Sequence, residues 1–347
     1  MENKKPVIGI TMGDPAGIGP EIALKALGNQ DLYDRSSPLI VGDGKVLERA
    51  KDHLGLPLEI HKIKSVGEAL FRPGTVDVYD LDRPGTERIT PAEISALAGA
   101  VAFDSVVTAI ELAKAGSVDA TVTGPIHKKS INDAGHHYAG HTEIYAHYTG
   151  TRRFAMLLAE ENFRVIHVST HVSLRQACDM VTTERVLEVI QLLDSGLRQL
   201  GISHGRIGVA GLNPHAGDSG LFGDEEIREI IPAIREAQRQ GYLVEGPVSP
   251  DTMFSKAIAG YYDGCVAMYH DQGHIPFKVA GFTWDQKQQK MKSVKGVNIT
   301  LGLPIIRTSV DHGTAFDIAG KNMASPDAML LAIDYAIRLA RHKKLEK

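Results

Sequence analysis

The sequence predicts an α/β protein built of two lobes, and its length, composition and patterning support this fold class. The chain has 347 residues, more than one small hydrophobic core usually holds together. Hydrophobic residues make up 43% of the chain and charged residues 23%, which is typical of a globular protein rather than a disordered one. Short apolar runs alternate with amphipathic stretches, and this alternation predicts a largely parallel sheet with helices on both faces.

The expected strands are short apolar runs that end at Gly, His or Pro. They lie at Val7–Thr11, 39–41, Ala120–Thr123, 164–169, Ile207–Ala210 and 265–268. The expected helices lie at 20–27, 91–114, Thr183–Gln199 and 224–240. Because ligands of parallel sheets bind beyond the carboxyl ends of the strands, the polar residues after each strand are the first candidates for a functional site.

The first lobe is expected to be discontinuous in the sequence. A Gly- and His-rich stretch at 125–140 is typical of a boundary, and the chain is expected to return to the first lobe near Pro304. The first lobe is therefore expected to comprise residues 1–137 and 306–347, and the second lobe residues 138–305.

The composition argues against several classes of protein. The net charge is −4 and no long basic block occurs, so nucleic acid is not an expected partner. Cys178 and Cys265 lack the spacing of a disulfide framework, which favours free cytosolic thiols. The N-terminus leads directly into the first strand and no run of about 18 apolar residues occurs, so neither a signal peptide nor a membrane span is expected. The expected location is the cytoplasm.

Three histidines, His171, His215 and His270, each come shortly after an expected strand. Three neutral imidazoles with an open coordination position suit a catalytic divalent metal ion such as zinc. The spacings are too wide for a short metal-binding motif. From the pattern alone, three loop histidines without a bound metal ion are therefore favoured over a metal site.

Two further groups of residues are polar. At 140–143, a loop with His141 and Thr142 looks like the start of a helix, where backbone N–H groups favour an anion, although Thr142 could simply cap the helix. The other group follows the third histidine and consists of Lys278, Asn298 and Arg307. An arginine can hold a carboxylate or phosphate by two parallel hydrogen bonds, although each of these residues alone is more often a surface residue.

The first strand runs into a glycine-rich turn at 11–21. Its glycines, Gly13, Gly17 and Gly19, do not have the G-x-G-x-x-G spacing of a dinucleotide-binding turn. We therefore expect a tight structural turn beside the active cleft rather than a phosphate site.

Six segments together are specific for one family. They are 11–21, 140–143, 169–171, 212–217, 269–273 and 297–320, and they occur in this order over nearly the whole chain. On these segments the sequence resembles the 4-hydroxythreonine-4-phosphate dehydrogenase (PdxA) family. The resemblance implies two α/β/α lobes with a cleft between them, similar to isocitrate and isopropylmalate dehydrogenases.

The resemblance also implies a homodimer whose active site is shared across the subunit interface, with the second lobe carrying the metal ligands and the interface. A divalent metal ion (zinc, magnesium or cobalt) would be held by His171 and His215 of one subunit and by His270 of the other. The residues implied to contact the substrate are His141, Thr142, Lys278, Asn298 and Arg307.

A second resemblance concerns the cofactor. Residues 311–320, followed by Ala324-Ser325-Pro326, look like the nucleotide loop of isocitrate and isopropylmalate dehydrogenases. The similarity implies NAD as cofactor and leaves NADP open. The residues implied to contact the adenosine half are His312, Gly313, Thr314, Ala315 and Asp317.

The implied chemistry is oxidation of a hydroxyl group followed by decarboxylation. The metal ion would act as a Lewis acid, and a base would take the hydroxyl proton. Asp271 and Lys278 are both candidates for this base, and the sequence does not choose between them.

Two segments bear on the substrate. Residues 220–226, and Gly273-His274-Ile275-Pro276, look more like the branch of the family that acts on 4-phospho-D-threonate or 4-phospho-D-erythronate, giving dihydroxyacetone phosphate and CO₂. His274 would contact a substrate hydroxyl, or would be a packing difference. The alternative is 4-hydroxythreonine 4-phosphate, in pyridoxine biosynthesis. A branch that acts on aromatic cis-dihydrodiol carboxylates is a more distant possibility.

A polar insert at 283–295 departs from the family, in which a much shorter link usually joins the flanking segments. It contains Trp284, the only tryptophan of the chain. We expect a solvated hairpin, and the alternative is a basic flap over the substrate phosphate.

Two other functional classes compete with a dehydrogenase. Three histidines and zinc would also serve a metallohydrolase, and a non-catalytic protein could use them to bind metal. The absence of a zincin helix motif and the presence of the 311–320 loop argue against the hydrolase. A metal-binding protein would not need Lys278, Asn298 and Arg307.

Overall fold

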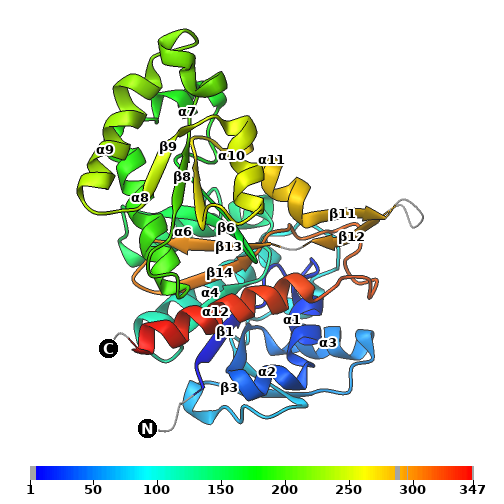
Figure 1. Cartoon of the computed structure of the whole chain (residues 1–347). Helices are drawn as coiled ribbons and strands as arrows, with labels where there is room; N and C mark the ends of the chain where they lie inside the picture. Colours follow the sequence, from blue (N-terminus) through cyan, green and yellow to red (C-terminus); the bar gives the residue numbers. More distant parts are fainter. Residues whose placement is uncertain (1–4, 286–289, 295, 346–347) are drawn as a thin grey trace. The chain divides into compact units, whose positions relative to one another are not determined.

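The chain folds into two compact units (Figure 1). The structure is a computed structural model, and it describes residues 5–285, 290–294 and 296–345. Unit 1 comprises Met1–Thr151 and Leu303–Lys347, and unit 2 comprises Arg152–Gly302. Both units combine a sheet with covering helices, so the expected α/β class is confirmed.

Unit 1 contains a parallel sheet in the order β3-β4-β2-β1-β5-β14. Its strands are β1 (Val7–Thr11), β2 (Ser37–Gly42), β3 (Glu59–Ile63), β4 (Thr75–Asp80), β5 (Ala120–Thr123) and β14 (Ile306–Val310). Its helices are α1 (Gly19–Leu27), α2 (Gln30–Arg35), α3 (Gly44–Leu54), α4 (Ala96–Lys114), α5 (Lys128–Asp133), α6 (His141–Thr149) and α12 (Asp327–Leu345), with short 3₁₀ turns η1 (Val66–Glu68) and η2 (Thr86–Arg88). The helix α12 runs in front of β1 in Figure 1 and packs against β5 and β14.

The helix α4 is the central helix of unit 1. In the described part of the chain it is the one helix long and apolar enough to cross a membrane, by length and composition alone. However, 56% of its apolar stretch is buried, and it packs against β1, β2 and β5, as a core helix does. Gly99 allows α5 to lie against it, because a Cβ at this position would overlap Ser130 O.

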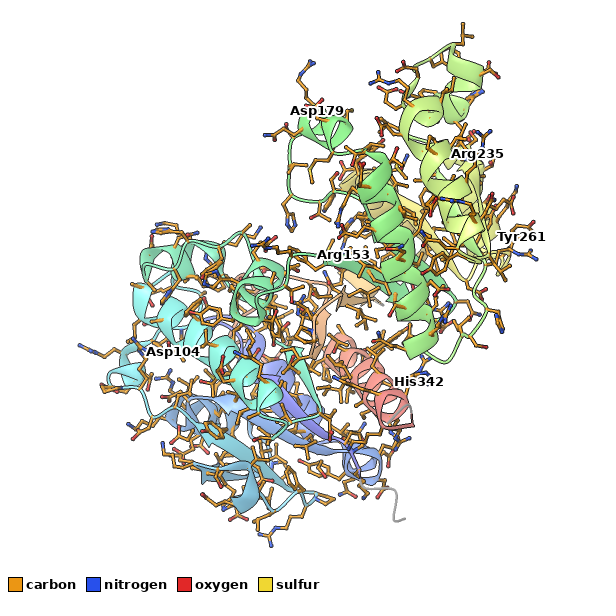
Figure 2. All side chains as sticks on the ribbon, turned by 90° about the vertical axis from the view of Figure 1, so that its left-hand side faces the viewer. Asp104, Arg153, Asp179, Arg235, Tyr261 and His342 are labelled. Atoms are coloured by element: carbon orange, nitrogen blue, oxygen red, sulfur yellow. The ribbon has the colours of Figure 1, made fainter. Side chains whose placement is uncertain are left out.

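Unit 2 contains a mixed sheet in the order β13-β6-β7-β10-β8-β9. Its strands are β6 (Ala155–Glu160), β7 (Phe163–His167), β8 (Ile207–Ala210), β9 (Val244–Val248), β10 (Gly264–Ala267) and β13 (Val297–Leu301). Its helices are α7 (Leu174–Asp179), α8 (Thr183–Gln199), α9 (Ile231–Arg239), α10 (Pro250–Ile258) and α11 (His270–Gly281), with the turn η3 (Pro214–Gly220) and the π-helical turn η4 (Glu226–Ile230). Figure 2 shows Arg153 at the start of this unit, where it bonds to Gln191 of α8.

The expectation of a largely parallel sheet fits unit 1 but only part of unit 2. In unit 2, β6 runs antiparallel to both β7 and β13. The reason is local: only Glu161 and Asn162 separate β6 from β7, so these two strands form a hairpin.

The compact units differ from the expected lobes mainly at residues 138–151, which belong to unit 1 rather than to the second lobe. The physical reason is the burial of α6. Ile144 and Tyr145 are fully buried in a cluster with Phe103 and Ile110 of α4. The return to unit 1 occurs at Leu303, close to the expected Pro304.

The insert at 283–295 contributes to an antiparallel pair, β11 (Phe282–Asp285) and β12 (Lys290–Val294). This pair forms a separate two-stranded sheet, with the antiparallel pairing that the expected hairpin requires. Residues 286–289 and 295 of the insert lie outside the described residues. A role as a flap stays a prediction.

Candidate active site

In unit 1, the end of β5, the start of β14 and the start of α6 bring polar residues together. Arg307 of β14 is 3% exposed, and its Nε and Nη2 lie 3.3 and 2.9 Å from Thr123 Oγ1 of β5. Its guanidinium lies 5.6 Å from the ring centre of Tyr145. Burial lowers the pKa of Arg307 to about 10, so the residue stays protonated at neutral pH. A buried cation of this kind is suited to hold an anionic group.

His141 is the first residue of α6 and belongs to the same group. Burial, and then the charge of Arg307, hold the pKa of His141 well below its usual value, so this imidazole is neutral. Its Nε2 is buried, with no hydrogen-bond partner among the described residues. An unpaired buried nitrogen is costly unless a ligand supplies its partner. His141 and Arg307 therefore fit the substrate role expected for them, and Thr142 follows in the same helical turn.

The depressed pKa of His141 predicts a pH dependence of stability. The unfolded imidazole has a pKa of about 6.5, so below that pH the unfolded chain binds a proton that the folded chain does not. The contribution of His141 is thus fully present above about pH 6.5 and is lost as the pH falls. Between about pH 7.5 and 5.5, wild type should lose about 1 kcal/mol more unfolding free energy than His141→Gln. Equal losses in urea titrations of both proteins would contradict this assignment.

In unit 2, two of the expected metal ligands lie close together. His171 follows β7 in an exposed loop, and His270 begins α11; their ring centres are 6.0 Å apart. Asp271 Oδ1 lies 2.7 Å from His270 Nδ1. A carboxylate at Nδ1 fixes a proton there and leaves Nε2 as the coordinating nitrogen, which is the usual arrangement around protein-bound metals.

His215, the third expected ligand, lies in η3, where residues 215–219 all have positive φ. Such backbone is strained for residues other than glycine and persists only where other contacts impose it. The carboxylate of Glu226 holds the residues just before this segment: Oε1 accepts from Leu212 N and Asn213 N at 2.7 and 2.8 Å, and Oε2 accepts from Asn213 Nδ2 at 2.9 Å.

Gln272 joins the segments that carry His270 and His215. Its Oε1 accepts from Met268 N at 2.6 Å, and its Nε2 donates to Gly211 O at 2.7 Å. Gly211 directly follows β8, and Met268 directly follows β10. Sequence reasoning missed Gln272 and Glu226 as supporting residues, because their burial and their contacts with backbone groups cannot be seen in the sequence.

Within one chain, the histidines that are expected to bind a divalent metal ion form only part of a metal site. Neutral imidazoles with an oriented Nε2 suit zinc or cobalt. However, the part of the chain that the structure describes contains no group of three His, Cys, Asp or Glu residues converging to hold a metal ion. His171 and His270 are brought together, and the structure does not place His215 with them.

The two remaining substrate candidates also lie in unit 2. Asn298 of β13 donates from Nδ2 to Met156 Sδ at 2.7 Å, and its Oδ1 is buried without a partner among the described residues. Lys278 is half-buried on α11.

The loop at 311–320 packs against the glycine-rich turn in unit 1. Ile18 N donates to Thr314 O at 3.0 Å. A Cβ at Gly17 would lie 2.9 Å from Thr314 Cβ, so the close approach requires glycine. In the same part of unit 1, the ring of Phe316 stacks on His127 with centres 4.8 Å apart. The turn thus supports the loop that carries the expected cofactor residues, His312 to Asp317.

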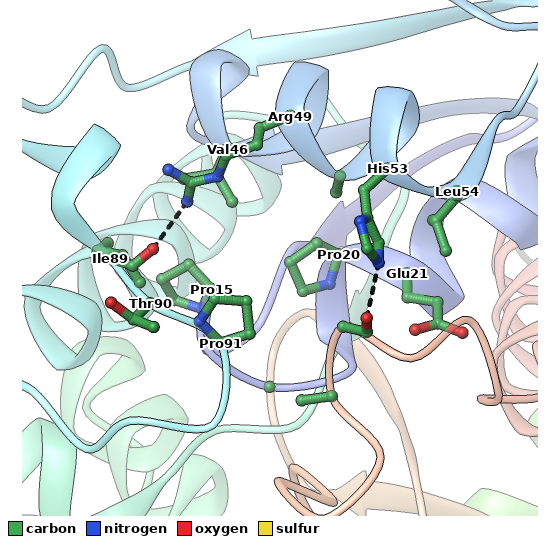
Figure 3. Close-up of a pocket in the computed structure, with 14 residues that line it drawn as sticks. Pro15, Pro20, Glu21, Val46, Arg49, His53, Leu54, Ile89, Thr90 and Pro91 are labelled. Carbon is green, nitrogen blue, oxygen red and sulfur yellow. Dashed lines mark hydrogen bonds between the residues drawn. The ribbon is translucent and has the colours of Figure 1, made fainter.

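A cavity of about 360 Å³ lies beside this turn in unit 1 (Figure 3). Most of its wall is apolar and comes from the turn, α3 and residues 89–91. Two of its polar side chains are held in place: Arg49 Nη2 donates to Ile89 O at 3.1 Å, and His53 Nε2 lies 2.6 Å from Gly320 O. The loop at 311–320 contributes Ala319 and Gly320, whereas the expected cofactor residues lie outside the described lining.

Comparison with known proteins gives a consistent result over nearly the whole chain. Residues 34–336 match the family model described as pyridoxal phosphate biosynthetic protein PdxA. A curated relative from Oceanobacillus iheyensis, named "Putative D-threonate 4-phosphate dehydrogenase", is 48% identical over 344 residues, covering 98% of this chain and 100% of the relative.

Two solved structures extend the comparison. A 4-hydroxythreonine-4-phosphate dehydrogenase from Klebsiella pneumoniae is 44% identical with a TM-score of 0.85, covering 97% of this chain and 100% of that one. A terephthalate 1,2-cis-dihydrodiol dehydrogenase from Burkholderia xenovorans is 30% identical with a TM-score of 0.66, covering 96% of this chain and 98% of that one.

Proposed function

Because the chain belongs to the PdxA family and its relatives are dehydrogenases, we propose that it oxidises and decarboxylates a 4-phosphorylated four-carbon hydroxy acid, with NAD as the acceptor. The favoured substrate is 4-phospho-D-threonate or 4-phospho-D-erythronate, which would give dihydroxyacetone phosphate and CO₂. The observation that carries this choice is the full-length relative named for D-threonate 4-phosphate, at 48% identity.

Five residues are proposed to bind the substrate. In unit 1, buried Arg307 holds an anionic group of the substrate, and His141 Nε2 and Thr142 complete the contacts there. In unit 2, Asn298 Oδ1, which lacks a partner among the described residues, accepts a hydrogen bond from the substrate, and Lys278 contacts the substrate as a second residue.

The metal ion is proposed to be held by His171 and His215 together with the partner's His270. When bound, it supplies Lewis-acid stabilisation of the developing negative charge. Asp271 is engaged with His270 Nδ1 and so orients that ring. We therefore assign the removal of the hydroxyl proton to the neutral amine form of Lys278 rather than to Asp271.

A homodimer fits the surface of unit 2. On α11, which begins at His270, the side chains of Ile275 and Val279 are 60% and 76% exposed. They are four residues apart and therefore lie on one face of the helix. Exposed aliphatic residues beside a metal ligand are suited to an interface with a second copy. A dimer would allow the partner's His270 to join His171 and His215 of this chain in one metal site.

The cofactor is proposed to bind through the loop at 311–320, with contacts from His312, Gly313, Thr314, Ala315 and Asp317. The loop is held against the glycine-rich turn by the bond between Ile18 N and Thr314 O. We place the enzyme in the cytoplasm.

The second candidate substrate is 4-hydroxythreonine 4-phosphate, which would place the enzyme in pyridoxine biosynthesis. The solved structure with a TM-score of 0.85 carries the name of that activity. The aromatic dihydrodiol branch is less favoured, because its relative is only 30% identical.

NADH formation distinguishes these candidates. The purified enzyme with a divalent metal ion is offered 4-phospho-D-threonate, 4-phospho-D-erythronate and 4-hydroxythreonine 4-phosphate in separate reactions. We expect the highest kcat/KM with one of the two sugar acids. Preference for the amino acid would exclude the favoured substrate but keep the chemistry. No NADH with any of the three would overturn the proposed function.

A further inference from the structure

His274 lies directly against His270 on α11. The two residues are four positions apart, so both project from one face of the helix. Their rings stack with centres 3.7 Å apart and an interplanar angle of 9°. His274 itself is only 7% exposed. The face of one proposed metal ligand is therefore covered by a second, buried imidazole.

A chain of hydrogen bonds fixes the proton on this second imidazole. His274 Nδ1 lies 3.1 Å from His270 O, which can only accept, so Nδ1 carries the hydrogen. The same Nδ1 lies 3.1 Å from His167 Nε2, which must then be an acceptor. The hydrogen of His167 is consequently on Nδ1, which faces Met156 O at 3.4 Å. With these tautomers, each N–H group faces an acceptor. With the opposite tautomer of His167, the lone pair of its Nδ1 would face Met156 O, and its Nε2 hydrogen would face the hydrogen on His274 Nδ1.

The packing around His167 leaves little freedom for this arrangement. His167 is 1% exposed at the end of β7, and burial lowers its pKa to about 3, so this ring is neutral at neutral pH. Gly273 is needed at its position, because a Cβ there would overlap His167 Nε2.

We propose that His274 is a positioning residue that, anchored through His167 to the backbone of β6, holds the His270 ring in the orientation that binds the metal ion. Asp271 holds the edge of that ring at Nδ1. His274 holds its face, so the plane and the tautomer of His270 are both set before metal binds. The inference rests on the proposed role of His270 in metal binding.

The test measures binding of Co²⁺ to the metal-free, full-length protein, by competition with a chelating indicator and by the visible absorption of the bound ion. His274→Leu removes both the ring and the hydrogen bond, and is expected to weaken Co²⁺ binding about 10- to 100-fold and to alter the spectrum. His274→Asn retains a donor at the Nδ1 position, and His274→Phe retains the stacking. Each of them should recover part of the lost affinity.

Two further variants make the outcome decisive. Phe277→Leu perturbs the buried side of the same helix, where Phe277 is fully buried, and should lower the melting temperature while keeping Co²⁺ affinity. Wild-type affinity in His274→Leu, or an equal loss in Phe277→Leu, would overturn the positioning role. His270→Ala reports on the premise: if it binds Co²⁺ as wild type does, the proposed metal site itself fails.

Discussion

Replacing Arg307 with Ala is expected to lower kcat/KM for the phosphorylated substrate by about a thousandfold, mainly through a higher KM. Arg307 is 3% exposed, and its guanidinium is braced against Thr123 and the ring of Tyr145. An anion bound there would lose a buried, charge-assisted partner, which costs about 2–5 kcal/mol. Arg307→Lys keeps the charge but not the planar pair of donors, so a loss of about ten- to a hundredfold is expected.

A matched control separates substrate binding from folding. Arg164 is a similarly buried arginine, 5% exposed, whose Nη1 and Nη2 donate to Asp263 O and Glu161 O at 3.1 and 2.6 Å. We expect Arg164→Lys to lower the melting temperature and to leave KM close to wild type. If Arg307→Lys changes only the melting temperature, as its control does, Arg307 is a structural residue and the proposed anion site is wrong.

The sequence predicts buried strands well, because burial requires a run of apolar residues that can be recognised. β1, β5 and β8 are short apolar runs between turn residues, and they match the expected ranges without change. β6 (Ala155–Glu160) was not predicted, although its apolar run is almost entirely buried. The edge strand β3 has mostly exposed or half-buried residues, so its pattern carries little hydrophobic signal.

The candidate site shows the same division. His171, His215 and His270 were candidates because each is a histidine shortly after an expected strand. In the structure, the ring centres of His171 and His270 lie 6.0 Å apart. Residue type did not reveal which groups hold them. Glu226 is distant in sequence from two of the three histidines and binds backbone N–H groups, and such contacts have no periodicity for sequence reasoning to detect. The roles of Asp271 and His274 likewise depend on atom positions.

A mixed dimer of two inactive variants is expected to recover activity. In the proposed dimer, each metal site takes His171 and His215 from one subunit and His270 from the other. His215→Ala therefore removes a ligand from the site of the subunit that carries it, and His270→Ala removes a ligand from the site of its partner. Each homodimer then lacks one ligand in both of its sites, and we expect nearly all activity to be lost. In the mixed dimer, the His270→Ala subunit keeps its own His171 and His215 and receives the partner's His270. One site is complete, so the purified mixed dimer should show about half the wild-type kcat per dimer.

Differently tagged chains, co-expressed and purified over both tags, provide this mixed dimer. A mixed dimer of His215→Ala with His171→Ala is the matched control. In the proposed dimer, both of these ligands bind in the site of the subunit that carries them, so neither change can be compensated by the partner. Each of its two sites lacks a ligand, so it should stay inactive. Recovery in the first pair but not in the second requires His270 to act across the interface. Failure of the first pair to recover would mean that all three ligands come from one chain, in which case His215 must approach the pair formed by His171 and His270.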